Sequence, residues 1–108
     1  MIALPPVLAR YVAAKNAHDI DALLACFAPG ARVRDEGEDL VGHDAVRAWL
    51  EKTSAKYRVT LEPLGYAENG DRLELTAKVT GTFKGSPITL RFDFGLDASG
   101  QIESLAIG

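Results

Sequence analysis

The sequence predicts an α+β fold in which a cone-shaped, curved antiparallel sheet wraps around three N-terminal helices. Apolar residues recur at helical spacing over much of the first half, and they alternate with a period of two after about residue 55. Turn signals at Asn69-Gly70, 84–86 and 98–100 divide this second part into four strands. The 108 residues, 47% hydrophobic and 25% charged, are typical of one globular domain spanning 1–108.

Three helices are expected before the long strands. The first has apolar side chains at helical spacing between residues 4 and 12. The second begins with Asp19 as its N-cap and continues through Phe27, until Ala28-Pro29-Gly30 ends it. The third begins at Gly42-His43-Asp44. Its predicted buried face consists of Val46, Trp49, Leu50 and Thr53.

Strand periodicity first occurs between the second and third helices. Ala31, Val33 and Asp35 alternate there with two arginines, and an acidic turn at 36–39 leads to a short strand at 40–41. The four long strands are expected near 57–68, 71–83, 87–96 and 101–107. The predicted inner face of the middle two strands carries Leu73, Leu75, Ala77, Val79, Phe83, Ile88, Leu90, Phe92, Phe94 and Leu96. Their opposite face is polar, as in a sheet covered on one side.

Charge and cysteine content exclude several classes of function. Twelve basic and fifteen acidic residues give a net charge of −3, so no basic surface for a nucleic acid is expected. No apolar run is long enough to span a membrane. The single cysteine, Cys26, cannot form an internal disulfide, which favours a reducing, cytoplasmic location. His18 and His43 have no metal-binding spacing, and nothing in the sequence indicates a cofactor or metal.

A curved sheet covered by short helices leaves an apolar hollow, which is a natural site for a small apolar molecule. The aromatic residues expected to line this hollow are Phe27, Trp49, Tyr57, Phe83, Phe92 and Phe94. The alternative is that most of these side chains pack in the core and only one or two contact a ligand.

Asp35 and Tyr11 are the candidate catalytic residues. Asp35 follows Ala31 and Val33 in the inward-facing series, so its carboxylate is expected among apolar neighbours with a raised pKa, as a general base requires. Tyr11 lies on the buried face of the first helix and could donate a hydrogen bond to an enolate oxygen. In the alternative reading, Asp35 only begins the acidic turn and Tyr11 is a core residue.

Several local strings resemble the nuclear-transport-factor-2-like superfamily, in particular its SnoaL-like branch of polyketide cyclases. These strings are YVAA at 11–14, HDIDAL at 18–23, CFA at 26–28, ARVRDEG at 31–37, GHDAVRAW at 42–49 and TFKGSP at 82–87. The resemblance covers nearly the whole chain and implies a cystatin-like α+β barrel. It also implies a homodimer formed through the outer face of the sheet.

The same resemblance implies roles for Asp35 and Tyr11. In the ketosteroid isomerases of this superfamily, an aspartate on the first strand is the general base, and a tyrosine on the first helix is an oxyanion donor. A second donor there is a protonated aspartate on a late strand. In this sequence the inward positions of that strand are Phe92 and Phe94, and Asp93 faces the other way unless a bulge near Gly95 alters the register.

Three functions follow from these observations. The first is a cofactor-free isomerase or cyclase that transfers a proton on a small apolar carbonyl compound, with Asp35 as the base. The second is a non-catalytic binder that uses the same pocket. The third is a dimeric assembly module, and dimer formation is compatible with either pocket function.

Overall fold

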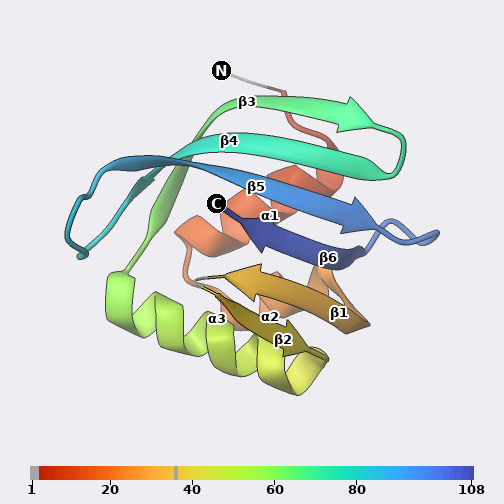
Figure 1. The fold of residues 1–108 in the computed structure, drawn as a ribbon, viewed down its shortest axis with the longest axis horizontal. Helices are drawn as coiled ribbons and strands as arrows, with labels where there is room; N and C mark the ends of the chain where they lie inside the picture. Colours follow the sequence, from red (N-terminus) through yellow and green to blue (C-terminus); the bar gives the residue numbers. More distant parts are fainter. Residues whose placement is uncertain (1–2, 36) are drawn as a thin grey trace.

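A curved six-stranded sheet faces three helices in the computed structural model, which describes residues 3–35 and 37–108 (Figure 1). The elements are α1 (Pro6–Asn16), α2 (Ile20–Ala25), β1 (Phe27–Asp35), β2 (Glu38–Val41), α3 (His43–Tyr57), β3 (Thr60–Asn69), β4 (Arg72–Thr80), β5 (Ile88–Leu96) and β6 (Ile102–Ile107). This arrangement confirms the predicted α+β architecture.

The strand order in the sheet is β2-β1-β6-β5-β4-β3. The four long strands form an antiparallel series, as the sequence predicts, and β2 also pairs antiparallel with β1. The pairing of β1 with β6 is parallel. This pairing brings the strand that ends at Asp35 beside the last strand of the chain, and residue alternation alone could not reveal it.

Local sequence signals account for several element boundaries. The Asp19 carboxylate accepts a hydrogen bond from the Ala22 amide at 3.1 Å, so it caps α2 as expected. Gly70 adopts a positive φ of 66° in the tight turn between β3 and β4. The pairing of these two strands shifts between Pro63 and Gly65, which marks a bulge in β3.

The predicted end of the second helix is wrong. Helix α2 ends at Ala25, and Phe27 is the first residue of β1. The Ile102 amide donates to the Cys26 carbonyl at 2.8 Å, and Phe27 pairs with Ile102. Backbone hydrogen bonding to the last strand therefore outweighs the helical spacing of the apolar residues, and Pro29 and Gly30 lie within the strand.

The predicted start of the first long strand and the end of the second are also wrong. Helix α3 continues to Tyr57, and β4 ends at Thr80, so Phe83 lies in the connection between β4 and β5. The Thr82 amide donates to the Tyr57 carbonyl at 2.7 Å, and the Gly81 amide donates to the Ser86 hydroxyl at 3.0 Å. These bonds turn the chain toward the end of α3 instead of extending the strand.

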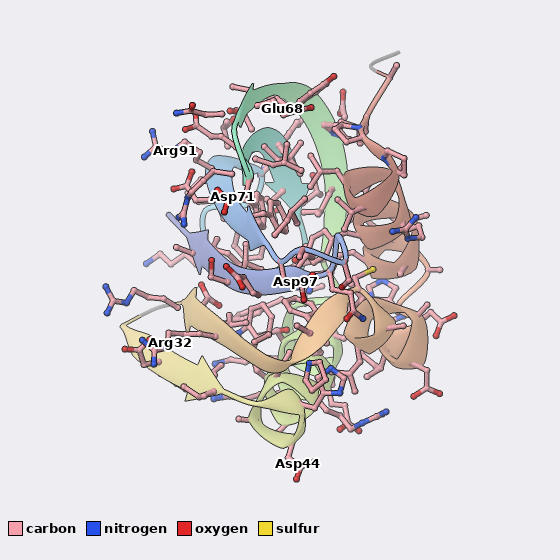
Figure 2. The ribbon with its side chains drawn as sticks, turned by 90° about the vertical axis from the view of Figure 1, so that its right-hand side faces the viewer. Arg32, Asp44, Glu68, Asp71, Arg91 and Asp97 are labelled. Atoms are coloured by element: carbon pink, nitrogen blue, oxygen red, sulfur yellow. The ribbon has the colours of Figure 1, made fainter. Side chains whose placement is uncertain are left out.

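The core lies between the helices and the concave face of the sheet. Tyr11, Phe27 and Phe94 are among its largest fully buried side chains. Arg32 and Arg91 extend from the opposite face of the sheet, away from α1 (Figure 2). The side of the sheet that faces the helices is therefore apolar and the outer side is charged. Within the described residues, no helix has the length and apolar character needed to cross a membrane.

Candidate functional site

A cavity of about 570 Å³ lies at one end of the cone. Strands β1, β4 and β6 end at this side of the sheet and β3 and β5 begin there, on the left in Figure 1. Most of its wall is apolar and includes Val59, Leu61, Val79, Phe83, Ile88, Leu90, Phe92 and Ile107. Its polar lining includes Tyr11, Lys15, Asp35, Trp49 and Thr53. An apolar cavity with a few polar groups is the usual form of a small-molecule site.

Asp35 faces this cavity from the last position of β1, as the alternation predicts. Its side chain is half-buried. The indole Nε1–H of Trp49 donates a hydrogen bond to its Oδ2 atom at 3.0 Å. Trp49 lies on the buried face of α3, so the helix and the sheet together fix the position of the carboxylate. The alternative that Asp35 merely begins the solvated turn does not describe this structure.

Tyr11 reaches the same cavity from α1 and is fully buried. Among the described residues, its hydroxyl has no hydrogen-bond partner. Burial raises the pKa of the phenol, and the Asp35 carboxylate and, to a smaller extent, Cys26 raise it further. The hydroxyl therefore keeps its proton and is available to donate to a ligand. Its ring packs edge-on against Phe94 at a centroid distance of 5.2 Å, which fixes its direction.

Lys15 is a site residue that the sequence analysis did not identify. The residue is only 7% exposed, and its Nζ atom lies 5.7 Å from the centroid of the Trp49 ring. Burial lowers the pKa of the ammonium group, and the Asp35 carboxylate opposes this shift. The position of Lys15, four residues after Tyr11, is the signal that could have revealed it, because residues at this spacing share a helix face.

A side-chain clamp holds this part of α1 against the sheet. The Asn16 amide group donates to the Leu61 carbonyl at 3.0 Å and accepts from the Leu61 amide at 2.7 Å. Asn16 is the last residue of α1 and follows Lys15 directly. The clamp therefore fixes Lys15 at the cavity beside the first residues of β3.

The predicted aromatic wall is divided between the cavity and the core. Trp49, Tyr57, Phe83 and Phe92 line the cavity. Tyr57 and Phe83 meet edge-on at a centroid distance of 5.9 Å. The structure places Phe27 and Phe94 elsewhere, because both are fully buried against Tyr11 and neither is among the lining residues.

Other predicted groups lie outside the cavity. Asp93 is on the outer face of the sheet, where its carboxylate is 3.8 Å from Nε of Arg91. His43 forms a 2.9 Å hydrogen bond with the Phe27 carbonyl, and the buried Cys26 thiol has a raised pKa because of burial. In the described part of the chain, no three His, Cys, Asp or Glu residues are grouped as a metal site would require. The predicted homodimer and cytoplasmic location stay predictions.

The sequence profile of the SnoaL-like domain matches residues 8–99. A solved structure from Sinorhizobium meliloti, provisionally named a polyketide cyclase, is 37% identical. It has a TM-score of 0.92, and the match covers 97% of this chain and 95% of that one. Among curated proteins, none matches the sequence significantly.

Two less similar structures share the fold. A Catenulispora acidiphila protein with a ketosteroid isomerase-like fold, solved with trimethylamine, is 20% identical with a TM-score of 0.85 over 98% of this chain and 86% of that one. An epoxide hydrolase/cyclase-like enzyme of pyran-ring formation in salinomycin is 22% identical with a TM-score of 0.83. That match covers 94% of this chain and 85% of the enzyme.

Proposed function

Because this chain belongs to the SnoaL-like domain family, we propose that it is an isomerase or cyclase that transfers a proton on a small apolar carbonyl compound without a cofactor. One observation carries the proposal. Asp35 and Tyr11 both line an apolar cavity, and the buried hydroxyl of Tyr11 has no hydrogen-bond partner among the described residues. These two groups match the needs of proton abstraction next to a carbonyl group, namely a base and a donor for the developing oxyanion.

The proposed reaction begins when Asp35 removes a proton from the carbon next to the carbonyl group. The electron pair of the C–H bond forms the C=C bond of an enolate, and the carbonyl π electrons move to oxygen. Tyr11 donates a hydrogen bond to that oxygen. In an isomerisation, the protonated Asp35 returns the proton to a different carbon; in a cyclisation, the enolate carbon attacks a second carbonyl group, whose oxygen takes up the proton.

Trp49 orients the base in this scheme. Its Nε1–H donates a hydrogen bond to Oδ2 of Asp35, and this bond fixes the carboxylate at the wall of the cavity. The apolar walls reduce the access of water, so the charges of the reacting groups are weakly screened. The name of the Sinorhizobium meliloti relative supports a cyclase within this class.

Deuterium exchange tests the proposal without knowledge of the natural substrate. The probe is 2-tetralone, an apolar ketone with acidic protons next to its carbonyl group, and the readout is loss of the proton NMR signal in D₂O. The protein is expected to accelerate the exchange, and Asp35→Asn to reduce the acceleration at least about 100-fold. Asp71→Asn, an exposed change in the turn between β3 and β4, is the matched control and should exchange normally.

The experiment also separates the enzyme from the non-catalytic binder. Binding of 2-tetralone without faster exchange would contradict the proposed reaction and favour a binding protein. Equal exchange rates for the wild type and Asp35→Asn would remove Asp35 from the role of base.

A further inference from the structure

We propose that Lys15 is the second oxyanion donor of this site, so that Tyr11 and Lys15 together hold one ligand oxygen. The inference rests on the proposed function and extends it to the class of ligand. The cavity would select a compound with an apolar body and a single oxygen that becomes negatively charged, such as an enolate or a phenolate.

One face of α1 brings the side chains of Tyr11 and Lys15 to the same cavity. Tyr11 and Lys15 are four residues apart on the buried side of α1, and both line the cavity. A fully buried hydroxyl without a partner among the described residues costs free energy unless a ligand accepts its hydrogen bond. The buried ammonium group on the next helical turn supplies a charge for the same ligand atom.

The charges of Lys15, Asp35 and the ligand oxygen would stay balanced throughout the proposed reaction. Before proton transfer, the positive charge of Lys15 is balanced by the carboxylate of Asp35, with which it interacts electrostatically. When Asp35 takes a proton it becomes neutral, and the enolate oxygen becomes the negative group. Lys15 then exchanges one counter-charge for another, so the net charge inside the cavity does not change. Avoiding an unpaired charge matters most where burial weakens screening.

Among the described residues that line the cavity, Asp35 has the one carboxylic acid side chain, and it is already assigned as the base. Phe92 lines the cavity, Phe94 packs in the core, and Asp93 lies outside beside Arg91. The second donor of this cavity therefore comes from the helix that also carries Tyr11.

A pair of matched ligands tests the inference. The two probes are 4-nitrophenol, which absorbs visible light when ionised, and 4-nitrotoluene, which has a methyl group in place of the hydroxyl. Binding is measured in the Asp35→Asn variant, whose neutral side chain imitates the base after it has taken the proton. The pH is kept below the pKa of free 4-nitrophenol.

Lys15→Met in this background is the decisive variant. The Asp35→Asn variant with Lys15 intact is expected to bind 4-nitrophenol in its ionised form. Lys15→Met should weaken that binding at least about tenfold, because a hydrogen bond to a charged group is lost. The exposed change Lys78→Met on the outer side of β4 removes the same charge and should have no effect. Binding of 4-nitrotoluene should not fall in either variant.

Four results would overturn the inference. Equal binding of ionised 4-nitrophenol with and without Lys15 would show that the ammonium group is not a donor. Binding of 4-nitrotoluene but not of 4-nitrophenol would contradict a site for a ligand oxygen, but it would still support an apolar cavity that binds ligands. Binding of neither probe would count against the proposed function as well. Trapping of 2-tetralone on Lys15 by borohydride would assign the amine to imine formation instead.

Discussion

The indole N–H of Trp49 donates to the Asp35 carboxylate at 3.0 Å, and this bond joins the middle of α3 to the end of β1. Trp49 also lies under the Lys15 ammonium group, at 5.7 Å from Nζ to the ring centroid. One side chain thus contacts both the proposed base and the proposed cation. The Trp49 side chain therefore does more than fill the core, because its N–H group bonds to Asp35 and the face of its ring lies below Lys15.

Replacing Trp49 by phenylalanine should separate the effect of its hydrogen bond to Asp35 from the effect of its contact with Lys15. Trp49→Phe keeps an aromatic face below Lys15 but removes the donor to Asp35. The base is then less well oriented, and the rate of 2-tetralone exchange is expected to fall about tenfold. In a double-mutant cycle with Asp35→Ala, the free energy of unfolding should show a coupling of about 1–2 kcal/mol. Additive effects would mean that the hydrogen bond contributes nothing to either property.

The stability of the protein should depend on pH through Lys15. The folded-state pKa of Lys15 is below the ordinary value of 10.5, so the unfolded chain binds more protons between those two pKa values. Folding therefore disfavours the charged lysine, and this penalty shrinks as the pH rises from the folded-state pKa to 10.5. Lys15→Met should accordingly raise the free energy of unfolding at neutral pH.

Urea unfolding of the wild type and Lys15→Met at a series of pH values measures this difference. The advantage of Lys15→Met is expected to shrink on approaching pH 10.5. Tyr11 has a raised pKa, so folding disfavours its ionised form and both proteins should lose stability above pH 10. That loss cancels in the difference between them. A difference independent of pH would show that only the packing of the side chain matters.

The fold could be predicted from the sequence because its signals are local. Asn69-Gly70 specifies a hairpin, Asp19 caps a helix, and alternation through Val33 places Asp35 on the inner face. The parallel pairing of β1 with β6 has no such signal, because it joins segments from opposite ends of the chain. The misplaced end of α2 has the same origin, since the hydrogen bonds of Phe27 and Cys26 are made with the last strand.

The candidate site was only partly predictable for a related reason. Asp35 and Tyr11 are apparent from their places in two periodic patterns, whereas Lys15 is charged and would ordinarily be expected at the surface. Its burial is tolerable because Asp35, twenty positions later in the sequence, opposes the cost. The composition around Lys15 gives no sign of this burial, and only its spacing of four residues from Tyr11 places it on the same helix face.

Phe83 and Phe94 should respond differently to the same truncation. Phe94→Ala removes a fully buried ring from the core and should lower the free energy of unfolding by about 3–5 kcal/mol. Phe83→Ala removes a half-buried ring from the cavity wall and should cost only about 1 kcal/mol, while binding of 4-nitrotoluene weakens. Chemical unfolding and ligand titration of both variants measure the two effects. Equal losses of stability would contradict the division of the aromatic residues between wall and core.

Gly81 controls how the connection between β4 and β5 meets the end of α3. A Cβ atom at this position would lie 2.5 Å from the Tyr57 carbonyl oxygen and 3.1 Å from two atoms of the Phe83 ring. The oxygen belongs to the backbone and accepts the Thr82 amide, so it cannot move away without breaking that bond. Gly81→Ala should therefore lower the free energy of unfolding by about 1–3 kcal/mol.

Gly30→Ala is the matched control for this change, because a Cβ atom there would meet nothing within 4 Å. Its stability should be unchanged or higher by up to about 1 kcal/mol, since alanine restricts the unfolded chain. Phe83 lines the cavity and lies in the connection that Gly81→Ala displaces. The Gly81→Ala variant should therefore also bind 4-nitrotoluene more weakly than Gly30→Ala does. If Gly81→Ala were as stable as the wild type, the connection would be free to shift, and the Tyr57 carbonyl would not be what positions Phe83.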